Sequence, residues 1–186
     1  MKKTMGEGVG LGRGFTLIEL LVVISIIGLL SSVVLSSLNS ARTKADDSQR
    51  NSIVGEYVKA LTLAYDAAGT GQYPATGNTS WWCLGDYAPT GPGNYGTLTA
   101  CYFNIYAENT TVNTAVATYL SSLPVLKPVT LFGTVVFSQP IYRCPNAGNC
   151  SQAEIQWFLQ QSNQQCIKGA TPSAISTGTQ CNLILN

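Results

Sequence analysis

Histidine does not occur anywhere in the 186 residues of this chain. It is the commonest general base and the commonest transition-metal ligand in proteins, so its absence argues against catalysis and against a transition-metal site. No close group of carboxylates offers an alternative acid–base pair. We therefore expect a protein that is not an enzyme and that uses no metal and no cofactor.

Charged residues are also scarce, at 10% of the chain against about 25% in ordinary soluble proteins. Beyond Arg50 the basic residues are few and scattered, at Lys59, Lys127, Arg143 and Lys168. Nucleic-acid binding needs a clustered positive face. The sequence therefore gives no indication of nucleic acid as a partner, and the outer surface is expected to consist mostly of uncharged polar side chains.

A long apolar run is the main feature that the sequence does contain. Residues 15–38 are 24 consecutive positions with a single charge, Glu19. As a helix they measure about 36 Å, which exceeds the roughly 30 Å of a bilayer core. Three basic residues precede the run and should remain in the cytoplasm, namely Lys2, Lys3 and Arg13. We expect one membrane-spanning helix, with the N-terminus inside and the remainder outside.

Glu19 needs an explanation in such a run. An ionised carboxylate in an apolar helix costs several kcal/mol unless it is neutralised or paired, and no cationic side chain lies within two helical turns inside the span. A plain single-pass anchor leaves Glu19 unexplained. A cleaved secretory signal is also a poor fit, because its apolar core has about 7–15 residues and ends in a small-x-small site. The partner of Glu19 is expected to come from elsewhere.

Residues 14–20, GFTLIEL, with the apolar run behind them, resemble the prepilin signature of type IV pilins and of the related type II secretion pseudopilins. The resemblance covers only the N-terminal part of the chain. It implies that a prepilin peptidase cuts between Gly14 and Phe15 and that the new N-terminal amine, on Phe15, is methylated. It also implies that Glu19 is an assembly residue, which meets the N-terminal amine of a neighbouring subunit.

Beyond the run, apolar residues return at intervals of three and four, which predicts one face of an amphipathic helix. These residues are Ile53, Val54, Tyr57, Val58, Leu61, Ala64 and Tyr65. No proline or strong breaker occurs before residues 68–71, so a single helix is expected over residues 15–67. Gly28 and the serine pairs at 31–32 and 36–37 are expected to weaken this helix locally.

The chain is expected to consist of a leader peptide (1–14), a transmembrane and assembly helix (15–38), its amphipathic continuation (39–68) and a globular domain (69–186). In this domain, residues 69–96 predict a long connecting loop and residues 112–123 a short helix. Strands are predicted at 129–137, 141–143, 155–159 and 182–185. The expected fold class is α+β and pilin-like, with the long helix packed on a small antiparallel meander.

Six cysteines lie beyond the apolar run, on the predicted outer side of the membrane. An even number in that location indicates disulfides, and no C-x-x-C pair points to zinc or to thiol redox chemistry. Six cysteines allow 15 pairings. We expect sequence neighbours to pair, as Cys83–Cys101, Cys144–Cys150 and Cys166–Cys181.

From these observations we interpret the chain as a structural subunit of a type IV pilus-like extracellular filament. Its expected partners are further copies of the chain, prepilin peptidase, the inner-membrane assembly machinery and membrane lipid. The precursor is expected in the inner membrane and the mature chain in the filament. The alternatives are a pseudopilin of a type II secretion system and a membrane-anchored surface binding module. Major pseudopilins usually carry an acidic calcium-binding loop near the C-terminus, whereas the last 30 residues here contain no Asp or Glu.

Overall fold

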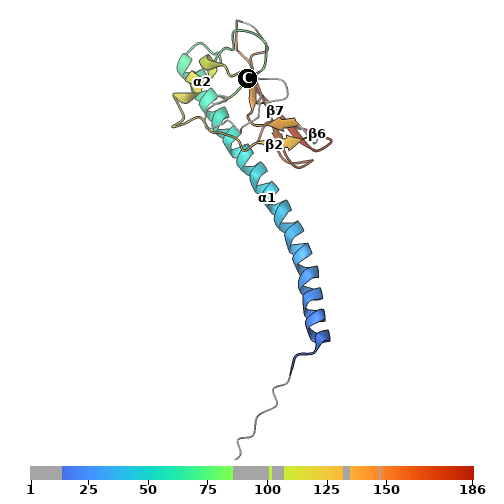
Figure 1. Ribbon diagram of the computed structural model, residues 1–186. Helices are drawn as coiled ribbons and strands as arrows, with labels where there is room; N and C mark the ends of the chain where they lie inside the picture. Colours follow the sequence, from blue (N-terminus) through green and yellow to red (C-terminus); the bar gives the residue numbers. More distant parts are fainter. Residues whose placement is uncertain (1–13, 86–100, 102–106, 132–134, 147) are drawn as a thin grey trace, which may run out of the picture. The chain divides into compact units, whose positions relative to one another are not determined.

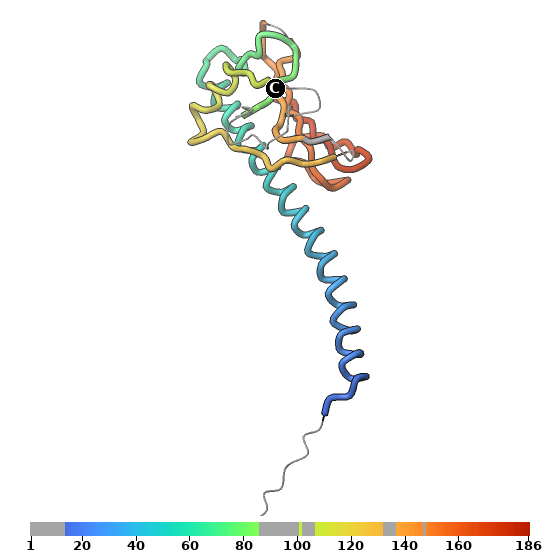
Figure 2. Tube along the Cα trace, in the orientation of Figure 1, coloured from blue at the N-terminus to red at the C-terminus, as the bar shows by residue number. Residues whose placement is uncertain are grey.

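The structure, a computed structural model, describes residues 14–85, 101, 107–131, 135–146 and 148–186 (Figures 1 and 2). The chain divides into two compact units, residues 1–41 and residues 42–186, and each is described by itself. Helix α1, Leu17–Ala68, begins in the first unit and ends in the second. Within the described residues it is the one helix that is long and apolar enough to cross a membrane.

The first unit consists, in its described part, of the start of α1. The helix is continuous through Gly28 and Ser36, where weakening is expected from the sequence (Figure 2). The hydroxyl groups of Ser25 and Ser32 donate to backbone carbonyls of the preceding turn, at 2.8 and 2.7 Å. Such bonds satisfy serine hydroxyls in an apolar helix without breaking it. The predicted apolar run is therefore a regular helix.

The second half of α1 buries one face in the globular unit. The buried positions follow intervals of three and four: Asp47, Arg50, Val54, Tyr57, Leu61 and Ala64. Three other residues of the predicted apolar face, Ile53, Val58 and Tyr65, pack at its margins and are half-buried. The amphipathic helix is thus confirmed, and its buried face extends further towards the N-terminus than the apolar pattern indicates, to the charged pair Asp47 and Arg50.

A five-stranded sheet covers this face of α1, with strand order β1-β4-β5-β7-β6 and every neighbouring pair antiparallel. Its strands are β1 (Trp82–Cys83), β4 (Ile141–Arg143), β5 (Ala153–Leu159), β6 (Thr171–Ile175) and β7 (Gly178–Leu185). Helix and sheet share one apolar core, in which Tyr57 and Leu61 of α1 lie with Ile155, Trp157 and Leu183 of the sheet. The α+β class is confirmed.

Several elements differ from the prediction. The helix predicted over residues 112–123 is α2, Thr110–Ala117; it starts earlier because the side chain of Asn109 accepts a hydrogen bond from Val112 N at 3.1 Å and caps it. The strand predicted over residues 129–137 is a separate hairpin, β2 (Val129–Leu131) paired with β3 (Val135–Phe137). The sheet is not a simple meander, because β7 pairs with β5 and β6 lies outside β7 at the edge.

Three disulfides fasten the connections of the globular unit, and they join sequence neighbours as expected: Cys83–Cys101, Cys144–Cys150 and Cys166–Cys181. The second closes the connection between β4 and β5, and the third ties the connection after β5 to β7. The loop predicted over residues 69–96 contains strand β1, and its part beyond Gly85 lies outside the described residues. Each disulfide stabilises the fold mainly by restricting the unfolded chain.

Removing Cys166–Cys181 by a double alanine substitution is expected to lower the free energy of unfolding by about 3 kcal/mol, since its loop spans 15 residues. Removing Cys144–Cys150, whose loop spans 6 residues, is expected to cost about 2 kcal/mol. Urea unfolding of the purified chain in detergent measures both losses. Peptide mapping without reduction checks the pairing itself, and a Cys150–Cys166 link would show that the connectivity is wrong.

Asp47 and Arg50 fasten α1 to two segments of the domain. The two carboxylate oxygens of Asp47 accept hydrogen bonds from the backbone N–H groups of Gln160 and Gln161, at 2.7 and 3.1 Å. The guanidinium of Arg50 donates to the carbonyl of Phe158 at 2.8 Å and to that of Lys127. Burial raises the pKa of the Asp47 carboxyl, although the two N–H donors act in the opposite direction. Both charges are thus buried with specific partners.

Asp47→Asn is expected to destabilise the globular unit by about 1–3 kcal/mol, because an amide offers one acceptor oxygen and turns an N–H donor towards the second backbone N–H. The neighbouring Asp46 forms an exposed ion pair with Lys127 at 2.8 Å and provides the matched control. Asp46→Asn should cost less than about 1 kcal/mol. The urea midpoints of the two variants measure these losses of stability. Equal losses of unfolding free energy in the two variants would contradict the buried role of Asp47.

Candidate assembly site at the start of the apolar helix

The N-terminus of α1 is closed by a reciprocal pair of hydrogen bonds. Thr16 directly precedes the helix, and its hydroxyl accepts from the backbone N–H of Glu19 at 3.3 Å. In return, one carboxylate oxygen of Glu19 accepts from Thr16 N at 2.8 Å and from Thr16 Oγ1 at 2.7 Å. This is a capping box, which satisfies two of the N–H groups that a helix start leaves without partners.

The capping box changes the account of Glu19 that the sequence suggests. In the sequence, Glu19 has no cationic partner within the span. The structure instead gives the carboxylate two polar donors from its own chain, which orient it, and no countercharge is placed beside it among the described residues. The signal for this was present as T-x-x-E at residues 16–19, directly before an apolar run.

The bond between Gly14 and Phe15, where cleavage is expected, lies just outside the helix. Both residues are exposed, and the side chain of Phe15 is 81% exposed. A Cβ atom added to Gly14 would meet no atom within 4 Å. The fold therefore does not require glycine at position 14.

The helix that follows presents an apolar surface on all sides. Every large apolar side chain of residues 15–38 is between 43% and 81% exposed, and Glu19 is the one charged residue among these 24. Such a surface is stable in lipid or against other apolar helices and unfavourable in water. Glu19 thus lies in the first turn of the helix, at the edge of an apolar surface that needs a cover.

The six cysteines, which the sequence also singles out, have a structural role. All six cysteines form disulfides. Within the described residues, no group of three or more His, Cys, Asp or Glu side chains is placed to hold a metal ion. The start of α1 is therefore where the expected site residues Gly14, Phe15 and Glu19 come together.

Comparison with known proteins gives one match. Residues 12–35 match the family model described as the prokaryotic N-terminal methylation motif, and this stretch contains Gly14, Phe15, Glu19 and most of the apolar run. The curated proteins and the solved structures gave no match. The chain carries the type IV prepilin-like cleavage and methylation motif, and this motif supports a type IV pilin-like or pseudopilin-like protein. Proteins that carry this motif are structural subunits. Together with the apolar helix, the motif fits a membrane-anchored precursor.

Proposed function

We propose that the protein is a structural subunit of a type IV pilus-like extracellular filament. The precursor spans the inner membrane through residues 15–38, and prepilin peptidase removes the leader, residues 1–14, by cutting between Gly14 and Phe15. The inner-membrane assembly machinery then adds the mature chain to the filament. One observation carries this proposal. The large apolar side chains of residues 15–38 are exposed, and the helix that they belong to begins inside a prepilin-like motif.

Assembly proceeds by packing of helices. The exposed apolar side chains of residues 15–38 leave lipid and pack against the same segment of neighbouring subunits. Cleavage creates a positive amine on Phe15, and Glu19 of an adjacent subunit supplies the negative partner. Two charges in a low-dielectric core stabilise each other only when they are well placed, so this pair favours one axial register of neighbouring subunits. The capping bonds from Thr16 hold the Glu19 carboxylate at the helix start meanwhile.

The leading alternative is a pseudopilin of a type II secretion system, which shares the motif and the long helix. The C-terminal region supports a pilin instead. Strands β6 and β7 and the turn between them contain no Asp or Glu, and neither do the residues that separate β5 from β6. Calcium prefers carboxylate and carbonyl oxygens, so the acidic loop typical of major pseudopilins has no counterpart in this part of the chain.

Shearing of intact cells tests the proposal. We expect the mature chain in the sheared fraction, as part of filaments visible by electron microscopy, and we expect the filaments to disappear when the chain is deleted. A membrane-anchored surface binding module would remain entirely in the membrane fraction. A pseudopilin would leave surface filaments unchanged on deletion and would abolish export of secreted proteins.

A further inference from the structure

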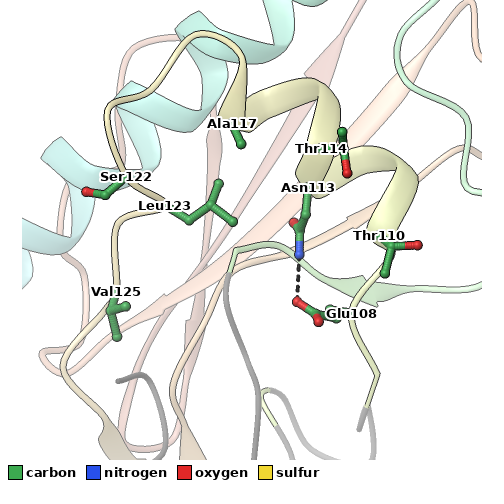
Figure 3. Close-up of a pocket in the computed structure, with 8 residues that line it drawn as sticks. All are labelled: Glu108, Thr110, Asn113, Thr114, Ala117, Ser122, Leu123 and Val125. Atoms are coloured by element: carbon green, nitrogen blue, oxygen red, sulfur yellow. Dashed lines mark hydrogen bonds between the residues drawn. The ribbon is translucent and has the colours of Figure 1, made fainter. Parts of the chain in front are cut away.

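An open pocket of about 460 Å³ lies beside α2 in the globular unit (Figure 3). Its size is within the range of about 300–1,000 Å³ that is usual for small-ligand sites. One wall comes from α2 and the residues before it, and the other from the segment that follows α2. The lining residues are Glu108, Thr110, Asn113, Thr114, Ala117, Ser122, Leu123 and Val125.

Glu108 is the one charged residue of the eight that line the pocket, and its position is fixed. Its Oε2 atom accepts from Asn113 Nδ2 at 2.8 Å, as the dashed line in Figure 3 marks. Asn113 is itself 7% exposed and held by Gly85, whose N–H donates to Asn113 Oδ1 at 2.9 Å and whose carbonyl accepts from Nδ2 at 2.8 Å. The carboxylate is therefore oriented without being neutralised.

No cation in the described part of the chain forms an ion pair with Glu108. The ion pairs among the described residues are Lys127–Asp46 and Arg143–Glu154, and neither involves the pocket. Three other lysines in the described part of the chain are exposed and take part in neither pair: Lys44, Lys59 and Lys168. The globular unit thus carries both an acidic pocket and several exposed lysines. Every further copy of the chain carries the same two features.

The lining suits an ammonium group on an apolar stem. The side chains of Leu123, Val125 and Ala117 provide an apolar wall, and Figure 3 shows Leu123 reaching from the far wall towards Asn113 and Glu108. A lysine covers such a wall with its methylene groups while its charged head keeps polar partners. The carboxylate of Glu108 gives that head a charge-assisted hydrogen bond, and it disfavours any anionic occupant.

We propose that this pocket receives a lysine side chain from a second copy of the chain, with its ammonium group on Glu108. The inference rests on the proposed filament, because assembly holds copies at fixed spacing and raises the effective concentration of each lysine near its neighbour's pocket. It assigns a specific contact to the globular units, in addition to the packing of the apolar helices.

Zero-length carbodiimide cross-linking of sheared wild-type filaments tests this contact. The reagent joins a carboxylate to an amine only where the two are in contact, so a bond between copies produces covalent dimers on a denaturing gel. We expect such dimers, and peptide mapping should find Glu108 joined to a lysine. Glu108→Gln keeps an acceptor for Asn113 and should lose this Glu108–lysine link, whereas Glu56→Gln, at an exposed acid on α1, should retain it.

A second variant keeps the test independent of any folding defect at Glu108. Changing the joined lysine to arginine preserves the positive charge but removes the amine, so filaments should persist while the cross-link disappears. Filaments in which peptide mapping finds no Glu108–lysine bond would overturn the pocket contact and leave the proposed function standing. Absence of wild-type filaments would overturn the proposed function first, and this contact with it.

Discussion

Glu19→Ala is expected to insert into the membrane and to be cleaved normally, yet to give almost no filaments when it is the only subunit. Insertion should not suffer, because the substitution removes the one charge from the 24 residues of the apolar run. Assembly should fail because the positive amine of Phe15 then enters an apolar bundle without a partner, and a single unpaired charge in such a core is strongly destabilising.

The matched control for Glu19→Ala is Ser25→Ala, in the same exposed helix. Ser25 donates to the carbonyl of Leu21 in its own helix, and its replacement leaves the charge pair of Glu19 and the Phe15 amine intact. This variant should give a normal filament yield. Comparison of the membrane and sheared fractions of both variants provides the measurement, and a normal yield from Glu19→Ala would show that the glutamate is only a helix-capping residue.

Gly14→Val is expected to abolish processing and to leave full-length precursor in the inner membrane. Gly14 is exposed, lies outside α1 and has no atom within 4 Å of an added Cβ, so valine there does not disturb the fold. Loss of cleavage in a folded, inserted chain would therefore report on recognition by the peptidase. Intact-mass measurement of the membrane fraction distinguishes precursor from mature chain.

Gly28→Ala is the appropriate control for the glycine substitution. Gly28 also has no atom within 4 Å of an added Cβ, but it lies inside α1, away from the expected cleavage bond. Its leader should be removed as in the wild type. If Gly14→Val were processed to the same mature mass as Gly28→Ala, cleavage after Gly14 would be refuted.

The features that could be predicted from sequence are those with a repeating or local pattern. The apolar run and the three-and-four spacing of Val54, Tyr57 and Leu61 predicted α1 and its buried face, because helix periodicity is local in sequence. The spacing of the cysteines suggested neighbour pairing, and the structure joins them in that way. The fold class followed from these elements and the short apolar strands.

Features that depend on distant parts of the chain could not be predicted in this way. Strand β6 contains Pro172 and is almost entirely exposed, so it shows no apolar alternation; it exists because β7 offers a free edge, where proline is tolerated. Asp47 and Arg50 resemble surface charges in sequence, and their burial depends on backbone groups more than 70 residues away. In contrast, the capping box of Thr16 and Glu19 is a local pattern, T-x-x-E directly before an apolar run, so it can be predicted from sequence.

We propose above all that this chain is a processed filament subunit. The most direct test is to measure the intact mass and the N-terminal sequence of the chain recovered from sheared filaments. We expect the recovered chain to begin at Phe15, to carry a methyl group on its new amine and to retain Glu19 near its start. Recovery of filaments whose subunits still carry residues 1–14, or whose subunits begin beyond the apolar run, would contradict it.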